Sequence, residues 1–241
     1  MITLWNLFIY NPIYNALILF VDVMPNFSIF ISVILVTIIV KLILYPLSYK
    51  SIKTQLQTKA LQPELNKIKK TITDKQEQAK KILEIYKEKG INPFSSFLLM
   101  LVQFPIIIAL YFVFRDIGEG INTEILYSFI KIPETINMLT FGFDLTEKSL
   151  VLAFLTGFTQ YIYLSISATM KKDPDDKNKS EPEKMMAMVG QSMKYTMPVM
   201  ITVFSYIVGG AVALYWVTSN VFMIFQEMYI QKKMKQEKTK A

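Results

Sequence analysis

The stretch that decides the fold class spans residues 27–47 and reads FSIFISVILVTIIVKLILYPL. It is apolar over about the 20 residues that an α-helix needs to cross the hydrocarbon core of a bilayer. Its one charged residue is Lys41. The whole chain of 241 residues is 52% hydrophobic with a mean hydropathy of +0.34, more apolar than an ordinary soluble domain. The stretch is therefore predicted to be a transmembrane helix of an integral membrane protein.

Three more apolar regions account for four further spans. Residues 93–115 and 149–170 are each long enough to cross a bilayer once. Residues 191–231 are too many for one helix, but Gly209 and Gly210 divide the region into two short spans. Five spans are therefore predicted.

Residues 1–25 precede the first span and contain no Lys or Arg. Their Trp, Phe and Tyr side chains are mixed with Asn and Asp, a composition typical of an amphipathic helix that lies in the membrane interface. We expect such an interfacial helix here.

Residues 49–92 change character, because they contain lysines and acidic residues throughout. Apolar residues recur at helical spacing in both halves, and Thr73 and Asp74 supply a turn and an N-cap between them. The pattern predicts an antiparallel helical hairpin outside the bilayer. Each apolar stripe is narrow, so a plain spacer between two spans explains the hairpin as well as a dedicated docking surface does.

The positive charges give the orientation. Residues 48–92 contain 11 Lys, residues 171–190 five and the tail from 232 five, against three Lys or Arg in 115–149 and none in 1–28. Lys and Arg gather on the cytoplasmic side, so a multi-pass protein of the plasma (inner) membrane is expected, with the N-terminus outside and the C-terminus cytoplasmic. The expected division is an outer interfacial helix at 1–25, spans at 26–48, 93–115, 149–170, 191–208 and 211–231, a cytoplasmic helical hairpin at 49–92, an extracytoplasmic loop at 116–148, a cytoplasmic loop at 171–190 and a basic cytoplasmic tail at 232–241. The predicted fold is all-α, a five-transmembrane-helix bundle with these appendages.

The composition excludes most enzyme chemistry. The chain has no Cys and no His, which removes thiol catalysis, Cys/His zinc sites and any Ser-His-Asp triad. None of its eight glycines lies in a nucleotide-binding motif. We expect no enzyme, no catalytic residue, no metal and no cofactor.

Lys41 is the main candidate for a functional residue. A Lys at the centre of a span costs about 2.5–3.5 kcal/mol on insertion scales, so it is a functional hypothesis by default. Snorkelling of its stem towards the cytoplasmic interface is the simpler alternative. Thr37 and Ser48 project from the same side of that helix as Lys41, which gives the span a polar stripe.

Other spans carry similar stripes. Isolated Ser and Thr in spans usually bond to their own helix, so the stripes matter only if they converge with Lys41 on a polar cavity open to the cytoplasm. The candidate groove residues are Lys41, Thr37, Gln103, Gln160, Tyr163, Trp216 and Asn220.

Four stretches resemble the YidC/Oxa/Alb family of membrane protein insertases. They are residues 36–47 (VTIIVKLILYPL), residues 61–65 (LQPEL), residues 92–111 with NP, QFPI and ALY, and residues 213–220 (ALYWVTSN). The order of parts also resembles the minimal five-span bacterial form, over nearly the whole chain. The family usually has Arg where this chain has Lys41. A planar guanidinium group that can form two parallel hydrogen bonds is thus replaced by a compact ammonium group.

The resemblance implies an insertase and chaperone that inserts and helps fold membrane proteins through a hydrophilic groove, as a monomer and without nucleotide hydrolysis. Nascent membrane proteins would be its substrates, the lipid bilayer its setting, and the ribosome and a Sec translocon further partners. The basic tail suits ribosomal RNA, though anionic lipid headgroups explain the same lysines equally well.

Two other classes remain as alternatives. In a small-solute or anion transporter or channel, Lys41 would bind an anion, but transporters usually show internal repeats and this chain has none that we find. A membrane-embedded enzyme would need an acid/base pair at depth, and Asp and Glu are confined to loops and helix ends.

Overall fold

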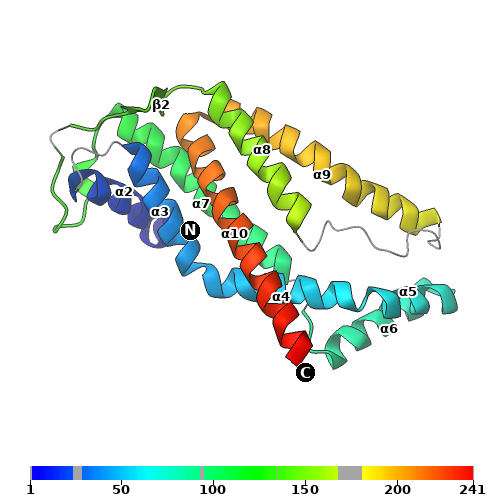
Figure 1. Cartoon of the computed structure of the whole chain (residues 1–241). Coiled ribbons are helices and arrows are strands. Elements are labelled where there is room, and N and C mark those ends of the chain that lie inside the picture. The colour runs from blue at the N-terminus through cyan, green and yellow to red at the C-terminus, as the bar shows by residue number, and fades with distance from the viewer. Residues whose placement is uncertain (1, 24–28, 93–94, 134, 168–180, 241) are drawn as a thin grey trace.

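The computed structural model is almost entirely helical, which confirms the all-α prediction. It describes residues 2–23, 29–92, 95–133, 135–167 and 181–240 (Figure 1). In chain order the elements are α1 (Ile2–Trp5), the π-helix η1 (Asn6–Tyr10), α2 (Asn11–Val23), α3 (Ile29–Ile43), α4 (Tyr45–Ala60), α5 (Gln62–Thr71), α6 (Lys75–Glu88), α7 (Ser95–Glu119), the short 3-10 helix η2 (Thr123–Ile125), β1 (Leu139–Thr140), β2 (Phe143–Asp144), α8 (Leu150–Ile166), α9 (Glu181–Val208) and α10 (Gly210–Lys240).

The first predicted span bends sharply near its C-terminal end. Helix α3 stops at Ile43, and α4 continues from Tyr45 at an angle of 62°. Pro46, in the first turn of α4, explains the break, because proline has no N–H to donate and its ring crowds the carbonyl four residues earlier. The apolar stretch thus continues as two helices that run in different directions.

Length and composition identify fewer spans than the five that were predicted. Among the described residues, Asn6–Val23 and Leu101–Glu119 are long and apolar enough to cross a membrane, and the bent pair of α3 and α4 makes a third. Helix α8 is apolar but only 17 residues long. The N-terminal segment passes the same test, although its sequence favours the interface.

Helices α5 and α6 form a pair that projects beyond the end of α4 (Figure 1). Asp74 caps α6, where its side chain accepts a hydrogen bond from the backbone N–H of Gln76 at 2.8 Å. Gln78 on α6 donates to the carbonyl of Lys69 on α5 at 3.1 Å. Leu65 and Ile85 are the buried residues of these two helices. The charged sequence therefore forms the two helices expected of it.

Helix α10 runs through the middle of the molecule and contacts α3, α4, α7, α8 and α9 (Figure 1). It follows α9 after a break at Gly209, whose φ of +119° lies in the region that glycine tolerates best. This glycine lets the chain turn sharply from α9 into α10, at the break that the sequence predicted. The two helices then diverge, and α8 packs against both of them (Figure 1).

The loop between α7 and α8 covers one end of the bundle. The N–H of Gly210, at the start of α10, donates to the carbonyl of Glu147 at 2.8 Å, and the next N–H, of Ala211, donates to Leu145 at 3.1 Å. The N–H of Ile29, at the start of α3, donates to Asn137 at 3.2 Å. Leu145 itself is buried in the core. The first turns of two central helices are therefore satisfied by this loop, which closes that end.

Helices α8, α9 and α10 expose large apolar side chains at the surface. Phe154 on α8, Met200 on α9 and Phe225 on α10 are each about two-thirds exposed, at 67%, 69% and 68%. A soluble monomer rarely leaves so many large apolar side chains uncovered. Hydrocarbon is the solvent that suits this surface.

Close packing of α8 on α9 depends on Gly157. A Cβ added there would lie 1.9 Å from Oγ1 of Thr202 and 3.0 Å from the carbonyl of Pro198. Gly157→Val should therefore separate the two helices and destabilise the protein by about 1–3 kcal/mol, the usual range for overpacking. The measurement is the thermal unfolding of the purified protein in detergent.

The matched control is Gly118→Ala, because a Cβ at Gly118 in α7 meets nothing within 4 Å. This variant should unfold at or slightly above the temperature of the parent, because Ala is favoured over Gly in a helix. An unfolding temperature of Gly157→Val equal to that of the parent would mean that α8 and α9 are not in contact at Gly157.

Candidate functional site: a buried lysine between three helices

Lys41 lies in the last turn of α3 and is 7% exposed. Its Nζ donates to Oε1 of Gln103 on α7 at 3.2 Å, and it lies 3.5 Å from the Sδ of Met223 on α10. The ammonium group is therefore enclosed by three helices that the sequence separates widely. Two predicted groove residues, Lys41 and Gln103, are in direct contact.

The amide of Gln103 extends this contact to a third side chain. While its oxygen accepts from Lys41, its Nε2 donates to the hydroxyl of Tyr215 on α10. Tyr215 is 1% exposed, so its hydroxyl is held inside the bundle. The three side chains form one hydrogen-bonded row across α3, α7 and α10, with a fixed direction for each bond.

All of these partners of Lys41 are neutral. The ion pairs among the described residues join Lys81 to Glu84 and Arg115 to Asp116, and Lys41 takes part in none. A buried ammonium group with neutral partners is only partly compensated for its lost hydration. The site is thus suited to an anionic group that comes from outside the fold.

A second polar cluster joins α10 to α8. Nδ2 of Asn220 donates to the carbonyl of Thr156 at 3.3 Å and to Oγ1 of Thr159 at 3.2 Å. The hydroxyl of Thr156 contacts the carbonyl of Ala213 at 3.1 Å. All three polar side chains are buried. Asn220, which was predicted to line the groove, thus makes interhelical hydrogen bonds of the kind that hold membrane helices together.

The other predicted residues lie around these two clusters. Thr37 is 1% exposed and donates to the carbonyl of Val33 on its own helix at 2.6 Å. Gln160 is buried on α8, and Tyr163, one turn further on, is half-buried. Trp216 is half-buried on α10, with its ring edge-to-face against Phe204 of α9 at 5.7 Å. Of the seven residues, the described contacts bring Lys41 and Gln103 together directly.

Polar contacts continue along α10 towards its C-terminal half. Gln226 donates to the hydroxyl of Ser48 on α4 at 2.8 Å. Glu227 is fully buried, and Gln231 donates both to Glu227 and to the carbonyl of Ile166 on α8, each at 2.8 Å. The sequence placed Asp and Glu in loops and at helix ends, but Glu227 lies well inside α10, which continues to Lys240 as one helix. Its burial follows from the packing of α10 against α8.

Two cavities lie beside the N-terminal helices, and no predicted groove residue lines either of them. One is an apolar crevice between the N-terminal segment, α3 and α7. The other is a smaller polar pocket between the same segment, the end of α7 and the loop that follows.

Comparison with known proteins assigns the chain to a family. A family model described as "60Kd inner membrane protein" matches residues 19–238. A curated relative from Clostridium tetani, named "Membrane protein insertase YidC", is 35% identical over 209 residues, covering 86% of this chain and 84% of the relative. The chain belongs to the YidC/Oxa family of membrane protein insertases. The resemblance read from the four sequence stretches is thereby confirmed.

Other relatives agree with this family. Proteins of the same name from Oceanobacillus iheyensis and Fusobacterium nucleatum are 32% and 34% identical, covering 86% and 84% of this chain and 76% and 86% of the relatives. A solved structure described as "Active YidC insertase crystal structure with the first transmembrane domain resolved" matches with a TM-score of 0.56 and 24% identity, over 89% of this chain and 45% of that chain. This last match supports the fold. The family and the apolar helices together make the chain an inner membrane protein.

Two residues that contact Lys41 or Gln103 were not predicted from the sequence, Met223 and Tyr215. Tyr215 lies within the family-like stretch 213–220, where Trp216 and Asn220 were singled out for their shared helical face. Met223 carries no polar signal. At about 100° per residue, Tyr215 and Met223 lie about 80° apart, on the side of α10 that faces α3 and α7. The polar stripe of α10 was therefore recognised on the side that faces α8 and overlooked on the other.

The contacts of Asn220 predict a structural effect of its removal. Asn220→Ala should destabilise the protein by about 1 kcal/mol, since interhelical hydrogen bonds in membranes average roughly 0.6 kcal/mol each. Thr218→Ala is the matched control, because Thr218 donates to Leu214 of its own helix. Thermal unfolding in detergent compares the two. If Asn220→Ala left stability unchanged but lowered insertion activity, Asn220 would act on substrate instead.

Proposed function

We propose that the chain is a membrane protein insertase and chaperone, and that its substrates pass through a hydrophilic groove around Lys41. Family membership and the printed names of the relatives support the activity. The single observation that carries the assignment of the site is the buried ammonium group of Lys41, which has hydrogen-bond partners from other helices but no carboxylate.

The proposed mechanism lowers the cost of moving a polar segment into hydrocarbon. An unsatisfied polar group in an apolar medium costs several kcal/mol, and a charged one costs more. A carboxylate of a substrate tail that approaches Lys41 would gain an ionic hydrogen bond, while Gln103 keeps the ammonium group aimed between α3, α7 and α10. Each partner then offsets the desolvation of the other.

Release needs no nucleotide in this mechanism. Once the tail has crossed, the apolar segment of the substrate moves from the groove into lipid, where its own helix satisfies its backbone. This transfer is downhill, so the free energy of partition drives the cycle. A transporter or channel is not favoured, because the relatives are insertases.

The proposed topology has five spans, a cytoplasmic hairpin of α5 and α6, and an interfacial N-terminal helix on the outer side. The distribution of Lys and Arg supports an outer N-terminus and a cytoplasmic C-terminus. The loop that binds the first turns of α3 and α10 would then close the outer end of the groove. The opposite end, near Ser48 and Gln226, would open to the cytoplasm.

Nascent membrane proteins are the proposed substrates, and a monomer is the proposed working unit. The ribosome is a candidate partner through the basic tail and loops, and a Sec translocon is a second one. Lys232, Lys233 and Lys235 are exposed at the end of α10, in keeping with either rRNA or anionic headgroups as their counter-charge.

Replacing Lys41 tests the charge directly. In liposomes that contain the purified protein, Lys41→Ala should lower the insertion of a single-span substrate with an acidic N-terminal tail by about tenfold. That ratio corresponds to roughly 1.4 kcal/mol, close to the lower limit for a hydrogen bond to a charged group. Lys41→Arg should retain activity, and a substrate with a neutral tail should be affected less. Protease protection of the tail is the measurement.

Lys131→Ala is the control, since Lys131 is an exposed lysine of the loop between α7 and α8. It should insert both substrates as the parent does. Equal loss of both substrates in Lys41→Ala would remove the electrostatic role, and no insertion by the parent above empty liposomes would contradict the proposed function.

Access of water to the groove can be mapped because the chain has no cysteine of its own. Single cysteines at Gln103, Gln160 and Trp216 should react with a membrane-impermeant thiol reagent added from the cytoplasmic side. A cysteine at Val33, which is 1% exposed among apolar neighbours, should stay unmodified. Protection of all three groove positions to the level of Val33 would contradict a water-filled groove.

A further inference from the structure

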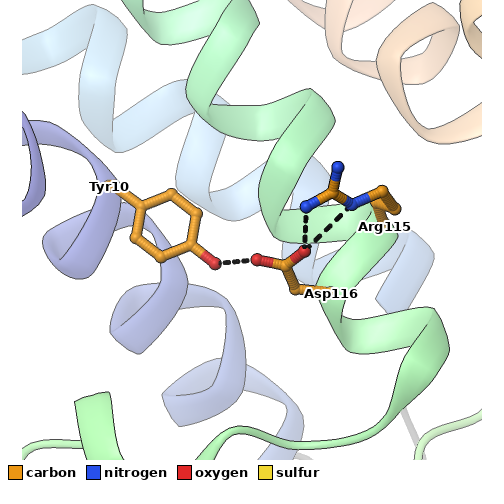
Figure 2. A network of polar contacts seen from close by, with 3 residues as sticks. All are labelled: Tyr10, Arg115 and Asp116. Atoms are coloured by element: carbon orange, nitrogen blue, oxygen red, sulfur yellow. Dashed lines mark hydrogen bonds and ion pairs between the residues drawn. The ribbon is translucent and has the colours of Figure 1, made fainter.

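The N-terminal helical run is fixed to the rest of the protein along one side. The hydroxyl of Tyr10 donates to Asp116 at the end of α7, and Arg115 donates to the same carboxylate at 3.0 Å (Figure 2). The hydroxyl of Tyr14 accepts from the N–H of Asn122 at 2.8 Å, and the side chain of Asn15 accepts from the N–H of Tyr127 at 2.7 Å. This polar side therefore faces the end of α7 and the loop after it.

The opposite side of the same run borders an apolar crevice. Its volume is about 480 Å³, and every one of its lining side chains is apolar. Phe8 and Pro12 line it from the N-terminal run, Val40 from α3, and Val102 and Pro105 from α7. Pro105 and Asp116 are about 16 Å apart along α7, at 1.5 Å per residue. The N-terminal run thus lies across α7, between the end of α7 that contains Asp116 and the crevice at Val102 and Pro105.

The mouth of the crevice opens sideways. Phe8, Ile43 and Leu101 border it and are 70%, 69% and 48% exposed. In an inner membrane protein these side chains meet hydrocarbon. With no polar partner in the lining, water has nothing to bond to and is excluded. An empty crevice would also forfeit the dispersion contacts of its walls, so a hydrocarbon group from the bilayer is the natural occupant.

Size decides which hydrocarbon group fits. The wall on α3 extends from Val36 to Leu44, about 12 Å of helix. A substrate span is about 30 Å long, so a helix lying along this wall would fit the crevice over less than half of its length. A segment of an acyl chain is thin and flexible, and it can lie in the crevice along the whole wall. We propose that this crevice is a binding site for one acyl chain of a bilayer phospholipid, held beneath the N-terminal helix.

The bound acyl chain packs against the apolar side of the N-terminal run, while Asp116 and the loop after α7 form hydrogen bonds with its polar side. Transfer of an acyl chain from bilayer to crevice releases no water, so selectivity comes from packing rather than from the hydrophobic effect. The bound chain should therefore exchange with the bilayer and be preferred over ordinary surrounding lipid only by a modest ratio.

The test uses the full chain in vesicles made with a phospholipid that carries a photoreactive diazirine on its acyl chain. After illumination, lipid adducts are mapped on peptides by mass spectrometry. We expect at least about threefold more adducts on the crevice walls than on the lipid-facing surface of α8 at Phe154 and Phe158. The wall residues compared are those that line the crevice from α3, the turn after it and α7: Ile39, Val40, Ile43, Leu44, Leu101, Val102, Pro105 and Ile106. Threefold corresponds to a preference of roughly 0.65 kcal/mol.

The second part of the test uses a variant in which larger side chains fill the crevice. Ala16→Phe combined with Val40→Phe should lower the wall adducts to the level of α8 and leave the α8 adducts unchanged. Ile207→Phe, on an exposed apolar position of α9, is the matched control and should change neither.

Equal adduct density on the walls and on α8 in the parent would overturn the proposal, and this comparison needs no variant. Wall adducts that persist in the filled variant would also overturn it. A nascent span with its own photoreactive side chain, if it labelled the walls in place of lipid, would assign the crevice to substrate.

Discussion

The structure depends on one unfavourable placement, an ammonium group inside a bundle of apolar helices. Lys41 donates one hydrogen bond to Gln103 and contacts Met223, but no described carboxylate neutralises it. The partners come from α7 and α10, so the charge can be held only where three helices meet. This requirement explains why α10 lies at the centre of the molecule and why a tyrosine and a glutamine are buried beside one another. A fold that merely needed stability would have an apolar residue at this position.

The surroundings of Lys41 differ between the two ends of the bundle. At one end the loop between α7 and α8 caps the first turns of α3 and α10 with its own carbonyls and buries Leu145. At the other, α3 breaks at Leu44 and α4 turns away by 62°. The break separates α3 from α4 just three residues after the lysine. One capped end and one broken end form the asymmetry that a groove with a single aqueous entrance needs.

Much of this could be read from the sequence, because the signals were local. A single lysine in an apolar run, glycines between two long apolar segments and an Asp after a turn predicted the importance of Lys41, the break between α9 and α10 and the cap of α6. Polar faces on separate helices put Lys41 and Gln103 among the candidate groove residues, but they did not predict that the two side chains are in contact. The pairing of Gln103 with Tyr215 could not be predicted in this way, since helical periodicity gives the face of a residue but not its neighbour 112 positions away. Two further features could not be predicted from the sequence, the burial of Glu227 and the crossing of α7 by the N-terminal run. Both depend on packing between distant segments.

In the proposed mechanism, the sign of the charge at position 41 selects the substrate. A charge exchange tests it most directly: Lys41→Glu and the parent are each reconstituted with two substrates that differ only in tail charge, one acidic and one rich in lysine. The ratio of the two inserted substrates is independent of how much variant protein folds. We predict that the parent prefers the acidic tail and that Lys41→Glu reverses the preference. The same ratio in both proteins would contradict the account, because Lys41 would then be a tolerated charge without a part in insertion.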